Sequence, residues 1–346
     1  MRSLAVLTTT AAISLMGVAS AETANAPPAA APADNVQSAM GAYAAYQMDI
    51  SDLRTRRMTD ADALEQAIDK ASSHSRDGLT RGWIAYGAGT AAQSPAFVQG
   101  VRDAAAYYGR DAVIWALTAD SSYARGLRGG PEATALVLAA ANADGARIAS
   151  VADRYQEMAY SLQRQRWASA VAPGQAARVQ RVRTLTAAGS AGAAISDISP
   201  RLAVTPASLS PGADPTAFGG RHFWDSLRSN GAQVVEAANP VTYRFRVDAP
   251  RGEAVNRMMT IGALEALNAT GERAAAVDTL MNEPRTKDCI TMAQLQLFQC
   301  MSAARFRYEN AFCLSQHAMR DVGACFSAVA RPDTAAMTPI PARTGG

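Results

Sequence analysis

The sequence predicts a mainly α-helical protein. An N-terminal helical bundle is followed by a Pro/Gly/Ser-rich linker and a C-terminal helical region, which should contain a disulfide-stapled α-hairpin and one short candidate β-hairpin. Apolar residues recur at steps of three and four along most of the chain, turn-forming residues interrupt these stretches, and all four cysteines lie in one C-terminal stretch. A hydrophobic content of 49% excludes a disordered polymer. The expected organisation is a signal peptide at 1–21, an Ala/Pro linker at 22–35, an α-helical bundle at 36–186, a linker or irregular loop at 187–220, a mostly helical C-terminal domain at 221–330 and a flexible tail at 331–346.

The first residues have the pattern of a secretory signal peptide. A short positive start, Met1-Arg2-Ser3, precedes an uncharged and mostly apolar stretch from Leu4 to Val18, and Ala19-Ser20-Ala21 is a small-x-small cleavage site. We therefore expect export, with cleavage after Ala21, into the periplasm. No later run approaches the roughly 18 to 20 apolar residues that span a bilayer, so no transmembrane anchor is expected after cleavage.

Between residues 36 and 186, caps and breakers predict a bundle of five or six helices. Alanine at many buried-face positions would allow these helices to approach closely. Thr59 is expected to cap a helix that continues through Ala71, and Ser94-Pro95 should start a helix that ends at Gly109. Gly129-Gly130-Pro131 should start the longest helix, which runs toward Trp167. Pro173-Gly174 should precede the last helix.

One segment beyond the linker has the alternation of a strand. Residues 241–247 alternate apolar and polar side chains, and Val234-Val235 is the expected antiparallel partner across Asn239-Pro240. Since an isolated two-stranded pair is marginal in water, it should lie on the helices or on another protein. The interaction candidates are Tyr243, Phe245 and Val247, where a partner could add a strand.

The cysteines form the most specific pattern in the chain. Cys289 and Cys300 are 11 residues apart and Cys313 and Cys325 are 12 apart, so two antiparallel helices with a turn near Phe306-Arg307 would carry them at matching heights, about 16.5 and 18 Å along the axis. This spacing favours the nested disulfides Cys289–Cys325 and Cys300–Cys313. A sequential pairing would require residues three helical turns apart to touch, and a crossed pairing would skew the helices.

A zinc site with His317 as an extra ligand is the competing interpretation. Structural zinc sites use cysteines two to four residues apart, whereas these two layers would lie about 16 Å apart, and an exported protein meets oxidising conditions. We therefore expect no metal and no cofactor.

The densest group of reactive residue types is His222, Asp225 and Ser226. His222 could act as a general base oriented by Asp225, although working triads are usually assembled from separated segments. The neighbouring Trp224 is instead typical of an aromatic anchor where a linker meets a folded domain. His222 and Asp225 are therefore weak catalytic candidates.

Three weaker patterns have simple structural explanations. The G-x-G-x-x-A run from Gly87 to Ala92 follows a strand-like segment, but no βαβ alternation surrounds it, so packing of small residues between helices is the simpler explanation. His74 is expected at an exposed helix end. The carboxylates of Asp60, Asp62 and Glu65 suit the first turn of a helix better than an acid/base pair.

Together these features favour an exported periplasmic protein that acts by binding, as an envelope structural or protein-interaction component. A periplasmic hydrolase of cell-wall or extracellular polymer is the first alternative, and a small-ligand carrier is the second. The expected partner is an envelope protein or polymer. The formal net charge of only +3 gives no reason to expect nucleic acid.

Overall fold

The computed structural model describes residues 35–189, 224 and 245–332, and these are mainly α-helical, as predicted. All of these described residues belong to one compact unit. The predicted signal peptide and cleavage site lie outside the described residues, as do nearly all of the predicted linker and tail. Hydrophobic residues on both sides of the linker predicted at 187–220 contribute to a single core. Ile50 of the predicted bundle and Met259 of the predicted C-terminal domain are both fully buried in it.

The described residues from 35 to 188 form eight helices, more than the five or six expected. The extra helices are α5 and α6, because Gly109 (φ 93°) turns the chain and a new helix begins at the next residue. The helices are α1 (Asn35–Thr55), α2 (Ala61–Ser72), α3 (Arg76–Ala91), α4 (Pro95–Tyr108), α5 (Arg110–Ala119), α6 (Tyr123–Gly126), α7 (Gly130–Leu162) and α8 (Gln175–Ala188).

Local capping chemistry explains where these helices begin. The Ser94 hydroxyl accepts a hydrogen bond from the backbone N–H of Phe97, as the sequence predicted for the start of α4. The cap of α2 is Asp60 and not Thr59, because the helix begins one residue later than expected. The Asp60 carboxylate accepts from the backbone N–H of Ala63 at 2.8 Å.

The C-terminal part contains two short strands that pair with each other. Arg246 of β1 lies opposite Arg331 of β2 in an antiparallel register, so the strand predicted at 241–247 pairs with a segment more than 80 residues away. The expected partner Val234-Val235 lies outside the described residues. The remaining elements, in order with the strands, are β1 (Phe245–Val247), η2 (Ala249–Arg251), α11 (Gly252–Ala266), α12 (Ala274–Met281), α13 (Pro284–Ala303), α14 (Arg307–Cys313), the π-helical segment η3 (Leu314–Arg320), α15 (Asp321–Ser327) and β2 (Ala330–Pro332).

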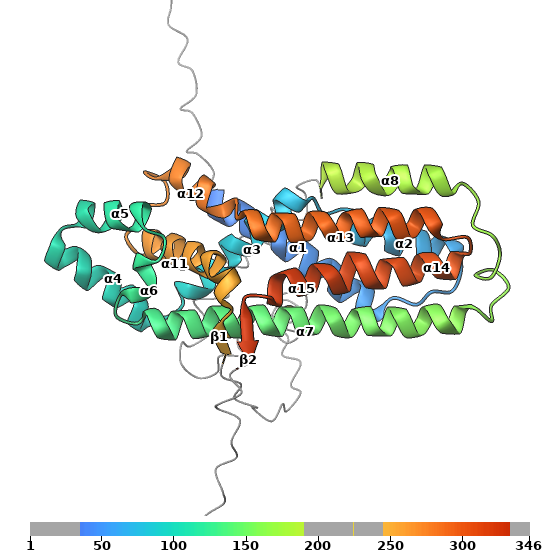
Figure 1. Cartoon of the computed structure of the whole chain (residues 1–346), viewed down its shortest axis with the longest axis horizontal. Coiled ribbons are helices and arrows are strands. Elements are labelled where there is room, and N and C mark those ends of the chain that lie inside the picture. Colours follow the sequence, from blue (N-terminus) through green and yellow to red (C-terminus); the bar gives the residue numbers. More distant parts are fainter. Residues whose placement is uncertain (1–34, 190–223, 225–244, 333–346) are drawn as a thin grey trace, which may run out of the picture. The chain divides into compact units, whose positions relative to one another are not determined.

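The disulfide-stapled α-hairpin is confirmed (Figure 1). Helix α13 is one leg, and α14, η3 and α15 together form the other, with the turn at residues 304–306. The disulfides are nested, with Cα–Cα distances of 5.8 Å for Cys289–Cys325 and 5.6 Å for Cys300–Cys313. The cysteine-bearing face of α13 is buried, as expected, through Ala293, Leu297 and Met301.

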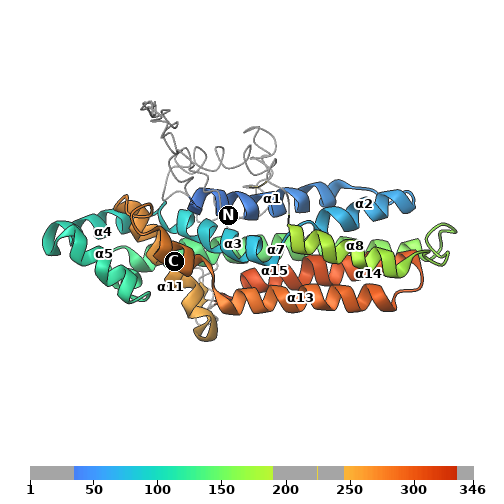
Figure 2. The ribbon, with the colours of Figure 1, turned by 90° about the horizontal axis from the view of Figure 1, so that it is seen from above.

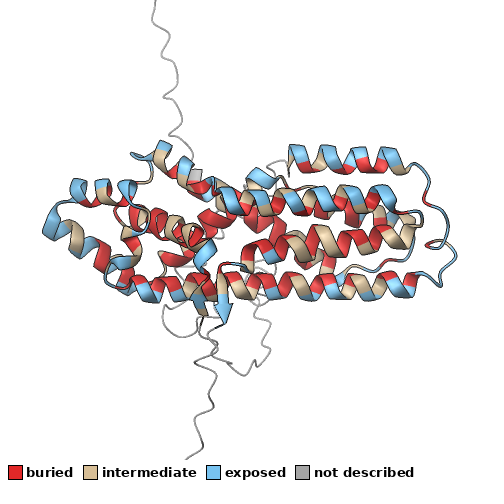
Figure 3. Cartoon of the chain, viewed as in Figure 1, coloured by how far each residue is buried: buried red, intermediate tan, exposed pale blue. Residues whose placement is uncertain are grey.

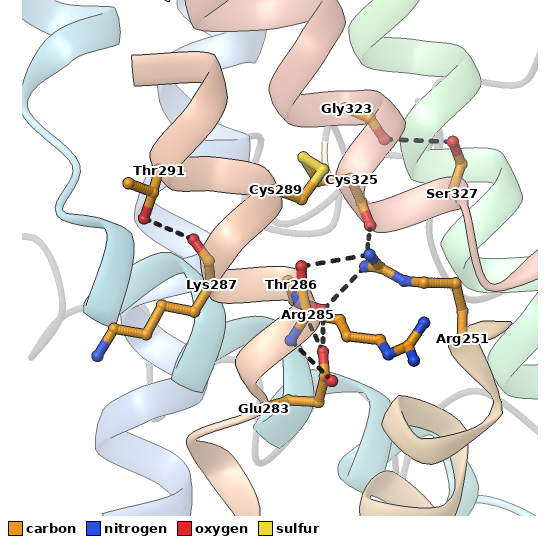
Figure 4. The surroundings of a disulfide bond; sticks show 10 residues. All are labelled: Arg251, Glu283, Arg285, Thr286, Lys287, Cys289, Thr291, Gly323, Cys325 and Ser327. Atoms are coloured by element: carbon orange, nitrogen blue, oxygen red, sulfur yellow. Dashed lines mark hydrogen bonds between the residues drawn. A yellow bond between two sulfur atoms is a disulfide. The ribbon is translucent and has the colours of Figure 1, made fainter. Parts of the chain in front are cut away.

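A half-buried arginine, Arg251, connects the open end of the hairpin to the preceding segment (Figure 4). The Arg251 guanidinium donates to the Thr286 hydroxyl at 3.0 Å and to the carbonyl oxygen of Cys325 at 3.1 Å, so it contacts both legs beside the Cys289–Cys325 disulfide. Glu283 caps α13 by accepting from the backbone N–H of Thr286 at 2.7 Å. This end of the hairpin is therefore held by a disulfide and by hydrogen bonds.

The longest helix, α7, runs beside the second leg of the hairpin, and its inner face is part of the core (Figures 1–3). Within the described residues it is the one helix long and apolar enough to cross a membrane by length and composition alone. Of its most apolar window, 56% is buried inside the structure, as is usual for the core helix of a globular unit. Helices α4 and α5 lie at the opposite end of the unit from the hairpin turn (Figures 1 and 2).

The glycine-rich run from Gly87 to Ala92 lies within α3 and its C-terminal cap, where it forms no phosphate-binding turn. A Cβ at Gly87 would lie 2.3 Å from the sulfur of Met258, and one at Gly82 would lie 2.6 Å from the carbonyl oxygen of Ala39. The small residues therefore allow α1 and α11 to pack closely on α3, as the simpler explanation predicted.

Removing either disulfide should destabilise the protein by an amount that grows with the logarithm of the number of residues in the loop that it closes. The double variant Cys289→Ser/Cys325→Ser opens a loop of 36 residues and should lower the free energy of unfolding by about 4 kcal/mol. Cys300→Ser/Cys313→Ser opens one of 13 residues and should lower it by about 3 kcal/mol. Urea denaturation measures both, and non-reducing peptide mapping checks the pairing. A crossed or sequential pairing would contradict the hairpin.

Candidate functional site

The residues singled out as catalytic candidates, His222 and Asp225, lie outside the described residues, as does Tyr243. Trp224, between the two candidates, is described and fully buried. Its indole N–H donates to Oδ1 of Asp144 at 2.6 Å, and its ring packs against Tyr86 with a centroid distance of 5.3 Å. Trp224 is therefore an aromatic anchor, inserted among the side chains of α1, α3 and α7.

Asp144 is the centre of a hydrogen-bond network inside the core. The Tyr43 hydroxyl donates to Oδ2 of Asp144 at 2.9 Å and accepts from the Gln47 amide at 2.8 Å. Arg147, one turn further along α7, donates to the side-chain oxygen of Gln47 at 2.6 Å and to the hydroxyl of Ser51. All of these groups are buried. Burial, followed by the charge of Asp144, raises the pKa of Tyr43 well above its usual value, so its hydroxyl keeps its proton. The network holds α1 against α7 away from solvent.

His74 does not lie at an exposed helix end, and that expectation was wrong. It is only 3% exposed, because its ring packs edge-on against Tyr46 and its Nε2 lies 2.9 Å from Oδ2 of Asp49. Lys70 donates to Oδ1 of the same carboxylate at 2.6 Å. Burial of Asp49 opposes its ionisation, but the hydrogen bonds and charges of His74 and Lys70 outweigh this effect and hold its pKa below the usual range. This cluster therefore links α1 to α2 and to the residues that follow it.

The other chemically reactive groups are also engaged in structural contacts. The Glu65 carboxylate accepts from Arg178 at 2.6 Å and from Arg181 at 2.5 Å, which joins α2 to α8. His317 Nδ1 lies 2.7 Å from Oδ2 of Asp321, one turn away on the same helical leg. Among the described residues, no group of three or more His, Cys, Asp and Glu could hold a metal ion.

A groove lies beside β1, where the sequence predicted an interaction surface. Phe245 and Val247 are half-buried against the core, and with Arg246 they form one wall of a groove of about 500 Å³. Arg125 and Leu138 are on the α6 and α7 side. The apolar side chains of the predicted strand are thus used partly for packing on α7.

Among the described residues, three strongly exposed aromatic side chains lie elsewhere, and the sequence reasoning missed them. Tyr107, Tyr108 and Trp115 are 82%, 66% and 70% exposed, and all three lie on the α4–α5 hairpin. We call these three residues the aromatic tip. The available signal was the helical periodicity of α5, because Trp115 falls between the buried positions Ile114 and Leu117 and off their stripe.

No family model, curated protein or solved structure matches this chain, so its function is argued from its own residues.

Replacing Trp224 by phenylalanine should lower the free energy of unfolding by about 1–3 kcal/mol, because the buried Asp144 carboxylate loses the indole hydrogen bond. Urea denaturation followed by circular dichroism measures the change. Trp115→Phe is the control, since this side chain is 70% exposed and should change stability by no more than about 0.5 kcal/mol. Equal effects of the two substitutions would contradict the anchor.

The Asp49 cluster should contribute stability that acid removes. Since the native pKa of Asp49 lies below its unfolded value, the contribution is present above about pH 4, the unfolded pKa, and is lost as the pH falls through the native pKa. Asp49→Asn should therefore destabilise the protein by about 1–3 kcal/mol at pH 7 and flatten its loss of stability below pH 4. Asp62→Asn, at an exposed position of α2, serves as the control in urea titrations at several pH values.

Proposed function

We propose that the protein is an exported, non-enzymatic binding protein of the periplasm that contacts an envelope protein through its aromatic tip. The two disulfides support an oxidising environment outside the cytoplasm, because thiols are kept reduced within it. The signal-peptide pattern at residues 1–21 supports the periplasm as the specific location.

The exposure of the aromatic tip is the observation that carries the proposal. Three large aromatic side chains on one hairpin leave apolar surface in contact with water, which is unfavourable unless a partner covers it. Tyrosine and tryptophan are enriched at the centres of protein interfaces, since each offers a large contact area and a polar group at its edge. An envelope protein with an apolar recess is therefore the partner chemistry that fits.

The hairpin that carries the aromatic tip is held in place by packing and hydrogen bonds. The inner face of α5 is buried through Val113, Ile114 and Leu117. Arg110, at the start of α5, donates to the carbonyl oxygen of Leu267 at 3.2 Å and to Glu272 at 3.0 Å. Because the hairpin is already ordered, it loses less conformational entropy on binding. More of the free energy gained by burying its aromatic side chains therefore appears as affinity.

The triple variant Tyr107→Ser/Tyr108→Ser/Trp115→Ser tests the proposal in pull-downs from envelope fractions. We expect the recovery of a specific envelope protein to fall at least tenfold, because the contact area of all three rings is removed. Met292→Ser/Leu295→Ser is the matched control, since both side chains are exposed apolar residues on α13, and it should retain the partner. Unchanged recovery by the triple variant would overturn the role of the tip.

Two further measurements separate the alternatives. Phe245→Asp alters the groove beside β1, and loss of the partner in this variant alone would move the interaction to that groove. Turnover of cell-wall polymer that His222→Ala abolishes would overturn the non-enzymatic proposal in favour of the periplasmic hydrolase.

A further inference from the structure

A cavity of about 310 Å³ lies between the end of α7 and the turn of the stapled hairpin. Ala159 and Tyr160 of α7 form one side, and Ala303, Tyr308 and Phe312 of the hairpin form the other. The Cys300–Cys313 disulfide is part of its lining. The proposed binding at the aromatic tip does not use this cavity, since the tip lies at the opposite end of the unit (Figures 1 and 2).

The chemistry of the lining is apolar and aromatic. The rings of Tyr160 and Phe312 form a tilted pair with centroids 6.5 Å apart, so together they make one aromatic wall of the cavity. The volume falls at the lower end of the range of small-molecule sites, which are mostly apolar with a few polar groups. Such a cavity suits a small aromatic molecule and is too small for a lipid.

The charged groups of the lining disfavour an anionic ligand. Within the described part of the chain, Glu309 is the one charged residue that lines the cavity, and no arginine, lysine or histidine does so. The Glu309 carboxylate accepts hydrogen bonds from the backbone N–H of Phe306, at 2.8 Å, and from that of Arg305, and so caps α14. A negative ligand would be brought close to this carboxylate with no cation in the lining to compensate.

The disulfide holds the cavity in shape. Cys300 and Cys313 join the two legs next to the turn, so the walls from α13 and α14 are fixed relative to each other before any ligand arrives. Further contacts hold the turn itself, since the backbone N–H of Ala172 donates to the carbonyl oxygen of Arg305 and the Arg307 guanidinium donates to that of Trp167. A preformed site binds with little ordering cost.

From this geometry we propose that the cavity binds a small neutral aromatic molecule. Its ring packs against the aromatic wall that Tyr160 and Phe312 form together, and Gln163 and Tyr308 supply polar groups at the edge of the cavity.

Fluorescence titration of the full chain with N-phenyl-1-naphthylamine, a neutral aromatic probe with a single N–H donor, tests the proposal. We expect saturable binding at one site and at least tenfold weaker binding of 8-anilinonaphthalene-1-sulfonate, its anionic analogue. Ala303→Trp should fill the cavity and weaken binding of the neutral probe at least tenfold. Leu295→Trp, at an exposed position of the same helix that does not line the cavity, should leave binding unchanged.

The other outcomes overturn the proposal. The proposal is contradicted if the wild type shows no saturable binding of the neutral probe, as it would if a segment of this chain or a second copy already filled the cavity. It is also contradicted if Ala303→Trp binds the neutral probe with the same affinity as the wild type. Thermal melting of both variants checks that they are folded. The triple variant of the aromatic tip should bind the probe normally, so a failure of the tip proposal and a failure of the cavity proposal are distinguishable.

Discussion

The close approach of α15 to α7 is the constraint on which the rest of the unit depends. A Cβ at Gly145 of α7 would lie 2.5 Å from the Cβ of Ser327, and one at Gly323 of α15 would lie 2.9 Å from Ile148. Glycine on both helices therefore lets their backbones meet with little between them. The Cys289–Cys325 disulfide then ties α15 to α13, so the second leg is held on one side by close packing and on the other by a covalent bond.

The Asp144 network lies one residue from this close approach and connects it to the middle of α1. Asp144 is buried beside Gly145, and a buried carboxylate is unfavourable unless hydrogen bonds compensate for the lost water. Tyr43 of α1 and Trp224 supply two such bonds. Both donors come from segments far from Asp144 in the chain. The buried Asp144 carboxylate therefore also determines where α1 and Trp224 pack. Such a network favours a single arrangement of the core.

The two proposed binding surfaces differ in how the fold produces them. The aromatic tip is exposed because α4 and α5 extend to the end of the unit, where no other helix of the described part of the chain packs on their outer faces (Figures 1 and 3). The cavity at the hairpin turn arises where α7 and the two hairpin legs meet, lined by the small residues Ala159, Ala303 and Ala304. One surface offers large side chains to a partner, whereas the other leaves space for a ligand.

Local rules determined much of this protein from the sequence alone. Helix periodicity, the Ser94 cap and the Gly109 turn act over a few residues, and the cysteine spacing defines the hairpin because a helix rises by a constant amount per residue. Only the tertiary structure decided the burial of His74, the pairing of β1 with β2 and the Asp144 network. Each of these depends on which distant segment covers a given face, and no pattern within a short stretch of chain contains that information.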